Sequence, residues 1–336
     1  MMDMRFKEIL LSIILLFFLP VICQKSYATV GGDCDVCHNL YPGMMEKTYS
    51  KKAFQYVLKN EFCVNCHSNI TSDTIKILGG NRVPVVYNSV PPINSLAGGN
   101  FYYVGKDFGD RKGHNVYKIA SSDMKFRNEP PGYSRRNDHS SIGYNFRENL
   151  MCAGSNGCHG DRNIEDPFLA IMGTHHAIDK PIDGSTTAKS YRFLKNTSNE
   201  KGVIGLEDKD WNQKANSNKH NEYSKSIDVV CISCHGSFHD IENKQGGWFR
   251  HPVGVALPFK KGYEDYKIYN IDAPIAREIL SNTSSSEINT GKDSVMCLSC
   301  HLAHAGPYDS ALRWDYENLY ASENGKSGCL ICHMGK

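Results

Sequence analysis

The sequence has few of the aliphatic residues from which proteins of this length usually build a core. Beyond the first 25 positions Leu, Ile and Val are thinly spread, whereas the chain carries 29 glycines and 18 tyrosines. Its 336 residues suffice for one large domain or two. A core made of peptide alone would be poor, because apolar burial is the main favourable term in folding. The composition therefore predicts that bound apolar groups complete the core.

The chain also lacks an excess of charge of either sign. Its formal net charge is +2, and its lysines and arginines form no stripe. A protein that binds nucleic acid needs such a positive surface to displace the counterions of the phosphate backbone. We therefore expect no nucleic-acid partner. Apart from the motif described next we find no internal repeat, and we expect a single domain over residues 29–336.

Cysteine and histidine recur in a regular order. Five times, two cysteines three positions apart are followed at once by histidine, which is the C-x-x-C-H attachment site of a c-type haem. Each thiol forms a thioether with one of the two haem vinyl groups, and the histidine binds the iron as proximal ligand. The motif cysteines are Cys34 and Cys37, Cys63 and Cys66, Cys231 and Cys234, Cys297 and Cys300, and Cys329 and Cys332, and the histidines are His38, His67, His235, His301 and His333.

One more motif, the third in chain order, is longer than the other five. Five residues separate Cys152 from Cys158, but His159 still follows directly. The alternative is a small disulfide loop beside an unrelated histidine. Gly154 and Gly157 would let the longer loop double back, and every other cysteine pair of the mature chain ends in the same way. We therefore predict six covalent c-type haems, which would supply the missing apolar core.

A long apolar run lies at the N-terminus. Residues 9–23 follow Arg5 and Lys7, and a Ser-Tyr-Ala stretch ending at Ala28 suits signal peptidase. An uncleaved membrane anchor is the alternative, but the run is short for a span of ~20 residues and contains Pro20. We predict a signal peptide over residues 1–28. The mature protein would be exported, to the periplasm or the cell exterior, without a membrane span.

Each haem iron needs a second axial ligand if it is to be low-spin and to have no open coordination position. Eight histidines lie outside the motifs. Seven are candidate distal ligands, and His139, in a charged loop, is the weakest of the eight. The seven candidates are His114, His175, His176, His220, His239, His251 and His304. One of them must be superfluous or serve another subunit. Met172 and Met296 are further candidates, although core packing is the simpler role for both.

Spacing restricts which iron some of these histidines can reach. His304 lies three residues after His301, and His239 lies four after His235. Neither easily reaches the far face of the haem that its neighbour holds, so each is expected to bind the iron of an adjacent haem. The side chains at positions 175–176 diverge because they are adjacent, and we expect them to serve two neighbouring haems.

Little regular secondary structure is predicted. Residues 44–60 have a partly apolar helical face, whereas residues 83–86 and 101–104 are short runs bounded by Gly and Pro that predict strands. Residues 123–141 are charged and contain Pro-Pro-Gly, which predicts a surface loop. The expected fold class is mostly coil with short helices and few short strands, organised around a chain of covalently bound haems.

Segments beyond the haem motifs carry a further signal. They are Gly98-Gly-Asn-Phe-Tyr102, Gly113-His-Asn-Val116, Gly157-Cys-His-Gly-Asp-Arg162, His175-His176, Gly184-Ser, Lys189-Ser-Tyr-Arg-Phe193, Cys231-Ile-Ser-Cys-His-Gly-Ser-Phe-His239, Arg250-His-Pro252, Cys297-Leu-Ser-Cys-His-Leu-Ala-His304, Pro307-Tyr308 and Leu312-Arg-Trp-Asp-Tyr316. Together they resemble a family of multihaem c-type cytochromes from metal-reducing and related anaerobic microbes, over most of the mature chain. The resemblance implies an exported electron-transfer protein with a continuous chain of mainly bis-histidine haems. Some similar cytochromes polymerise into extracellular filaments, which makes a homopolymer one candidate assembly.

Two functions compete. An electron conduit would pass single electrons to redox partner proteins or an extracellular acceptor and would not be an enzyme. A reductase of a small nitrogen or sulfur oxyanion would need an iron with an open distal position. The sequence contains no C-x-x-C-K motif, which often marks the open haem of pentahaem nitrite reductases, and histidines are in surplus. We favour the conduit. Zinc ribbons are a third interpretation, but they would need no histidine after every cysteine pair.

Overall fold

The structure is a computed structural model. It describes residues 30–38, 62–107, 111–121, 130–133, 150–177, 182–195, 200–208, 216–236, 251, 253–259, 263, 265–319 and 328–333. The predicted signal peptide, the predicted helix over residues 44–60, His139 and His239 all lie outside the described residues.

Most of the described backbone is coil, and its regular elements are short. The α-helices are α3 (Cys63–His67), α4 (Pro167–Ala170), α5 (Ser226–His235) and α6 (Cys297–Cys300). The 3-10 helices are η1 (Cys34–Val36), η3 (Phe101–Tyr103), η6 (Thr187–Lys189), η7 (Tyr191–Phe193), η9 (Asp309–Ala311) and η10 (Gly328–Ile331). The strands are β1 (Ser68–Asn69), β2 (Ile75–Leu78), β3 (Asn81–Pro84), β4 (Tyr87–Asn88), β5 (Met151–Ala153), β6 (Gly157–Asp161), β7 (Leu194–Lys195), β8 (Gly205–Leu206), β9 (Glu222–Ser224) and β10 (Ala276–Arg277). The predicted fold class is confirmed.

One of the two predicted strands is wrong. Strand β3 overlaps the first prediction, but residues 101–104 contain the 3-10 turn η3. The cause is Asn100, whose side-chain oxygen accepts a hydrogen bond from the Tyr102 backbone N–H at 2.9 Å. Such a cap offers the backbone a local partner in place of a neighbouring strand. Aromatic residues therefore form a turn here, although their type favours strands.

The strands form four small sheets. Strands β2 and β3 pair antiparallel from Ile75 opposite Pro84 to Leu78 opposite Asn81, and β1 pairs parallel with β4. A parallel sheet has the order β5-β6-β7, and a mixed sheet has the order β10-β9-β8. Sheets this small cannot cover a core alone.

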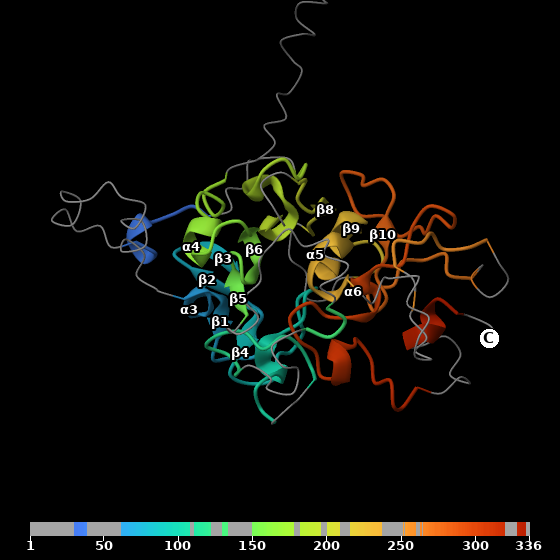
Figure 1. The fold of residues 1–336 in the computed structure, drawn as a ribbon, viewed down its shortest axis with the longest axis horizontal. Helices are drawn as coiled ribbons and strands as arrows, with labels where there is room; N and C mark the ends of the chain where they lie inside the picture. The colour runs from blue at the N-terminus through green and yellow to red at the C-terminus, as the bar shows by residue number, and fades with distance from the viewer. Residues whose placement is uncertain are drawn as a thin grey trace, which may run out of the picture.

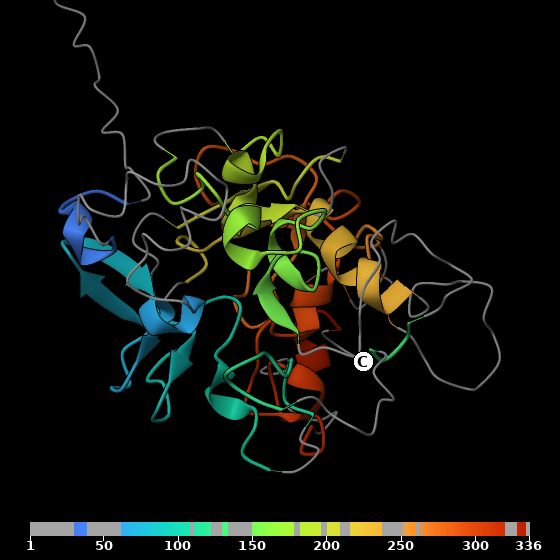
Figure 2. The same cartoon turned by 60° about the vertical axis from the view of Figure 1, so that its left-hand side comes forward.

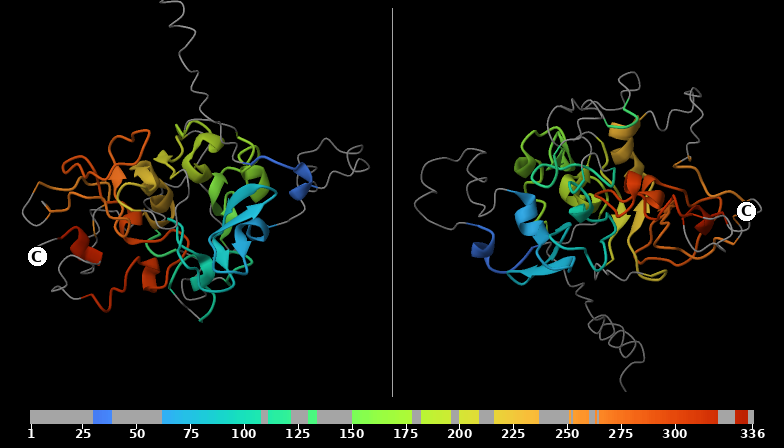
Figure 3. Two further views of the ribbon diagram at one scale, coloured as in Figure 1. Left: turned by 180° about the vertical axis from the view of Figure 1, so that it is seen from behind. Right: turned by 90° about the horizontal axis from the view of Figure 1, so that it is seen from below.

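The chain advances along the long axis of the molecule. Helix α3 and strands β1 to β4 lie toward one end, β5 and β6 lie beside them, and α5, β9, β10 and α6 follow toward the end that carries the C-terminus (Figure 1). In the turned view the blue and cyan segments lie on the left, the green segments in the middle and the gold α5 on the right (Figure 2), and the views from behind and below show the succession again (Figure 3). No helix within the described segments has the length and apolarity needed to cross a membrane.

Within the described residues the peptide core is divided into three small clusters rather than one. The first contains Tyr191, Val203, Tyr223, Ile227, Ala276, Met296 and Leu298. The second contains Leu257, Tyr266, Tyr269, Ala273, Ile275, Val295 and Ile331, and the third Phe101, Val104, Val116 and Ala305. The first two clusters include residues of the last two motifs, so the peptide core packs directly against cysteine pairs.

Candidate haem-binding site

The regular motifs lie on short helical turns. Helices α3 and α6 begin at Cys63 and Cys297, α5 ends at His235, and η1 begins at Cys34. Residues three apart in a helical turn lie on the same side of it. The fold therefore presents the two thiols of such a motif toward a common partner.

The longer motif reaches a similar arrangement through strands. Strands β5 and β6 pair in parallel, which brings Ala153 beside His159. Gly154 has a φ of +87°, a conformation that glycine adopts without strain. A Cβ at Gly157 would lie 2.6 Å from the backbone of Ala153. Both glycines are thus needed for the loop to double back, as the sequence predicted.

The described cysteines are unlinked, and all except the exposed Cys329 are half-buried. No disulfide joins any of the eleven cysteines whose side chains are described, Cys152 and Cys158 included. Burial raises the pKa of Cys158 and of Cys332 to about 12, and that of Cys300 to about 11. These groups are therefore neutral thiols at pH 7. In the described residues no group of three or more His, Cys, Asp or Glu side chains is arranged to hold a metal ion. A structural zinc site usually has four such ligands.

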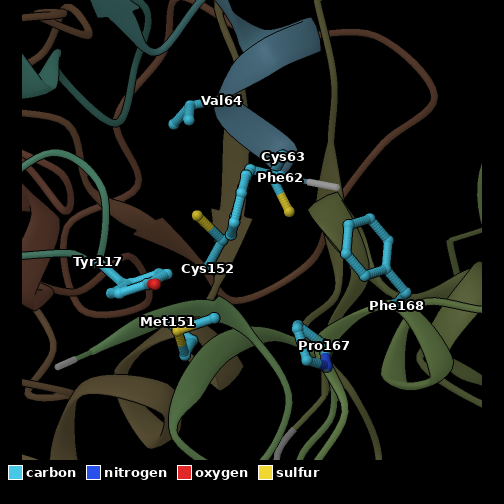
Figure 4. A pocket seen from close by; sticks show the side chains of 8 residues that line it. All are labelled: Phe62, Cys63, Val64, Tyr117, Met151, Cys152, Pro167 and Phe168. Atoms are coloured by element: carbon cyan, nitrogen blue, oxygen red, sulfur yellow. The ribbon is translucent and has the colours of Figure 1, made fainter. Parts of the chain in front are cut away.

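Thiols of successive motifs approach one another. Cys63 of the second motif and Cys152 of the third contact each other through a hydrogen bond, as do Cys231 of the fourth and Cys297 of the fifth. Cys63 and Cys152 share an apolar pocket, in which their sulfur atoms lie close to each other (Figure 4). The pocket is lined by Phe62, Cys63, Val64, Tyr117, Met151, Cys152, Pro167 and Phe168. Neighbouring attachment sites are therefore contiguous.

Five motif histidines each lie opposite a histidine from outside the motifs. The ring centroids are 6.0 Å apart in His38–His176, 6.3 Å in His67–His175, 6.3 Å in His159–His304, 6.0 Å in His235–His114 and 6.1 Å in His333–His251. Metal–nitrogen bonds to histidine are about 2 Å long, so two imidazoles that bind one ion from opposite sides have centroids roughly 6 Å apart. The spacing of all five pairs matches a shared metal ion.

The pairing follows the spacing argument made from the sequence. His175 and His176 lie opposite histidines of two different motifs. His304 lies opposite His159 and not opposite its sequence neighbour His301. The backbone N–H of His304 donates to Gly98, and a Cβ at Gly98 would lie 3.3 Å from the His304 ring. The Gly98 segment thus holds this ring in place.

Backbone carbonyls hold the second nitrogen of several rings. The Nδ1 atoms lie 2.6–2.8 Å from carbonyl oxygens, in the pairs His67–Pro84, His159–Arg192, His235–Pro131, His301–Ser310 and His114–Ala303. A carbonyl oxygen only accepts, so Nδ1–H must donate and the Nε2 lone pair is left for a metal. Every residue has a backbone carbonyl, so no sequence pattern marks these hydrogen-bond partners and the sequence analysis did not predict them.

Desolvation keeps five of the paired imidazoles neutral. Desolvation lowers the pKa of His67, His114 and His159, and it lowers the pKa of His175 to about 4 and that of His304 to about 3. An imidazole must be deprotonated at one nitrogen to bind a metal. These side chains are consequently in the metal-binding form at pH 7.

Two predicted ligands stand apart from the pairs. His220 is 3% exposed, its ring stacks on Tyr269 at 3.5 Å, and its Nε2 lies 3.4 Å from Glu222. Within the described segments no second imidazole lies opposite His220 or His301. His239, which the sequence predicts to reach the iron of an adjacent haem, lies outside those segments.

Comparisons with known proteins find similar sequences and folds. A family model described as a doubled C-x-x-C-H motif matches residues 288–336, which contain the fifth and sixth motifs. The predicted resemblance to multihaem c-type cytochromes, filament-forming members included, is confirmed.

A particular relative is the C-type cytochrome OmcS of Geobacter sulfurreducens. The two sequences are 21% identical, over 89% of this chain and 82% of the relative. Among solved structures, the OmcS nanowires of Geobacter sulfurreducens match with a TM-score of 0.51 at 20% identity, over 85% of this chain and 84% of theirs. An outer membrane cytochrome S filament from the same organism matches with a TM-score of 0.46 at 17% identity, over 87% and 85%. The chain is thus similar to OmcS in sequence and fold.

Proposed function

We propose that the mature chain binds six covalent c-type haems and passes single electrons along them, as a carrier or conduit and not as an enzyme. The observation that carries the proposal is the set of five imidazole pairs with centroids 6.0–6.3 Å apart. Each pair joins a motif histidine to a histidine elsewhere in the chain. Such pairing closes both axial positions of an iron, which suits electron transfer better than substrate binding.

The haems would be held by six cysteine pairs and their histidines. The attachment residues are Cys34, Cys37, Cys63, Cys66, Cys152, Cys158, Cys231, Cys234, Cys297, Cys300, Cys329 and Cys332. The proximal ligands are His38, His67, His159, His235, His301 and His333, and the assigned distal ligands are His176, His175, His304, His114 and His251. We assign His239 to His301, on its spacing from His235 alone, and we assign no iron to His220.

The side chains of this protein would prepare the irons for electron transfer. Bound haem supplies the redox couple. The two imidazoles of a pair would hold a bound iron in both oxidation states, so little would have to rearrange on electron transfer. The carbonyl bonds to Nδ1 fix the ring orientations. Contact between thiols of successive motifs supports a continuous path along the long axis of the molecule.

The proposed setting is outside the cytoplasm. The predicted signal peptide over residues 1–28 supports export, and the likeness to OmcS supports an extracellular location and a homopolymer. Redox partner proteins or an extracellular acceptor would then receive the electrons.

Intact mass and optical spectroscopy of the purified holoprotein test the proposal. The expected result is a chain beginning at Thr29 with the mass of six haems, a reduced spectrum typical of low-spin c-type haem, and no carbon monoxide binding. Fewer haems, or zinc in the cysteine pairs, would overturn the haem assignment. Carbon monoxide binding at one iron with native stoichiometry would instead favour the reductase.

A further inference from the structure

A short segment that follows the fifth motif lies between two distant parts of the chain. Residues 302–306, which we call the central segment, are joined by two backbone hydrogen bonds to residues 98–100 and by two more to residues 112–114. These bonds run from the His304 N–H to the Gly98 carbonyl at 2.7 Å, from the Asn100 N–H to the Ala305 carbonyl at 2.9 Å, from the His114 N–H to the His304 carbonyl at 3.0 Å, and from the Gly306 N–H to the Lys112 carbonyl at 2.9 Å. The central segment therefore holds both of its neighbours in register.

The central segment positions the distal histidines of two different pairs. His304, which is one of its own residues, lies opposite His159. His114 lies opposite His235, and its Nδ1 donates to the carbonyl of Ala303 in the central segment at 2.7 Å. In the proposed function these two pairs belong to the third and fourth haems, whereas the central segment follows the fifth motif. One stretch of backbone thus supports the ligands of two irons.

Close packing restricts the movement of the central segment. Ala305 is fully buried, and a glycine faces it from each side. A Cβ added at Gly99 would overlap the carbonyl oxygen of Ala305, and one added at Gly113 would lie 2.6 Å from the Cα of Ala305. The ring of Phe101 also stacks on the His304 ring, with centroids 4.7 Å apart. Because such packing yields little, a displacement imposed on one side has to be passed to the other.

We infer that the central segment is a single positioning unit for two irons, so that its displacement from either side withdraws both His304 and His114 and opens the third and fourth haems together. The inference rests on the proposed function. The coupling is carried by backbone hydrogen bonds and not by the imidazole rings. Truncation of one ring should therefore open one iron, whereas displacement of the central segment should open two.

Carbon monoxide titration of the reduced holoprotein tests the inference with substitutions on opposite sides of the central segment. Gly99→Ala and Gly113→Ala each place a methyl group against Ala305, and we expect each variant to bind about two carbon monoxide molecules per chain. Adding His304→Ala to Gly113→Ala should then cause no further uptake, because the iron at His159 is already open. Gly31→Ala is the control, since no atom lies within 4 Å of its added Cβ, and it should bind none.

The number of opened irons decides the outcome. If each glycine variant binds about one molecule, each histidine is held by its own neighbouring segment and the inference fails. A full set of haems with no uptake in either variant would also overturn it. The haem mass and low-spin spectrum of the unaltered protein report separately on the proposed function, because they do not depend on the coupling.

Hydrogen exchange of the unaltered holoprotein provides the answer if neither glycine variant matures. The backbone N–H groups of Asn100 and His304 form the bonds on one side of the central segment, and those of His114 and Gly306 form the bonds on the other. A single unit exposes all four in one opening, so their protection should be equal once intrinsic exchange rates are taken into account. Protection that differs between the two sides would contradict the inference.

Discussion

Histidine occupies two kinds of environment in this molecule. The paired imidazoles lie opposite one another at 6.0–6.3 Å, and carbonyl oxygens hold several of their Nδ1 atoms. His220 instead lies against Tyr269 and Glu222. His220 is buried, whereas His176 and His251 of the pairs are exposed, so burial does not identify a ligand. The presence of a second imidazole at the distance of a shared ion separates them.

Removal of one distal imidazole should open one iron. In His304→Ala the iron at His159 would lose its second nitrogen ligand, so about one haem of the proposed six should become high-spin and bind carbon monoxide. His220→Gln is the matched control, because it alters a buried histidine outside the pairs and should leave every haem low-spin. Optical titration with carbon monoxide measures both. Equal uptake by the two variants would contradict the assignment.

At the scale of single residues, the sequence predicted part of the candidate site. The motifs identified the proximal histidines as candidates, and the spacing of His304 from His301 indicated that they serve different irons. The choice of His114 for His235, and of His251 for His333, was out of reach, because each pair joins segments far apart in the sequence. His220 resembled the other candidates until the structure placed it beside Glu222.

At the scale of elements, a buried ionic network joins β9 to β10. Arg277 of β10 binds Glu222 of β9 and also Asp293, and all three side chains are 4% exposed or less. Arg277→Met would leave two buried carboxylates without their cation, which should lower the free energy of unfolding by about 3–5 kcal/mol. Denaturant unfolding of the holoprotein measures this loss.

A surface pair between the same regions provides the control. Lys225 and Glu278 lie 2.9 Å apart, but their side chains are 42% and 50% exposed. Lys225→Met should therefore cost less than about 1 kcal/mol. If the two substitutions destabilised the protein equally, the network around Arg277 would have no special role.

The strand-built third motif depends on a close backbone approach. In Gly157→Ala the new Cβ would lie 2.6 Å from the Ala153 backbone, so the loop could not double back and Cys152 should lose its position. We expect a mass deficit of one haem in a large fraction of the purified chains. Gly31→Ala is the control, because no atom lies within 4 Å of its added Cβ. Full haem loading in both variants would show that the loop adapts.

The elements themselves were only partly predictable. Gly154 and Gly157 indicated the reversal of the third motif correctly, because their conformational freedom is local. The turn at Phe101–Tyr103 was not predicted, since it depends on the Asn100 side chain and on a hydrogen bond from the Asn100 N–H to Ala305, about two hundred residues away. Contacts between residues so far apart in the chain leave no local sequence pattern.

At the scale of the whole molecule, the order of the motifs in the sequence is also their order in space. The contacts Cys63–Cys152 and Cys231–Cys297 join successive motifs, and the elements that carry them follow one another along the long axis (Figure 1). The three peptide clusters are small, as the shortage of aliphatic residues predicted. The arrangement suits a chain that wraps a row of cofactors.

Electron paramagnetic resonance of the oxidised holoprotein, together with its haem mass, tests the central claim most directly. The account predicts six haems per chain and low-spin signals from at least the five irons whose imidazole pairs are described. A predominantly high-spin spectrum from a sample with full haem mass would contradict it, because two imidazoles on each of those irons would then be excluded.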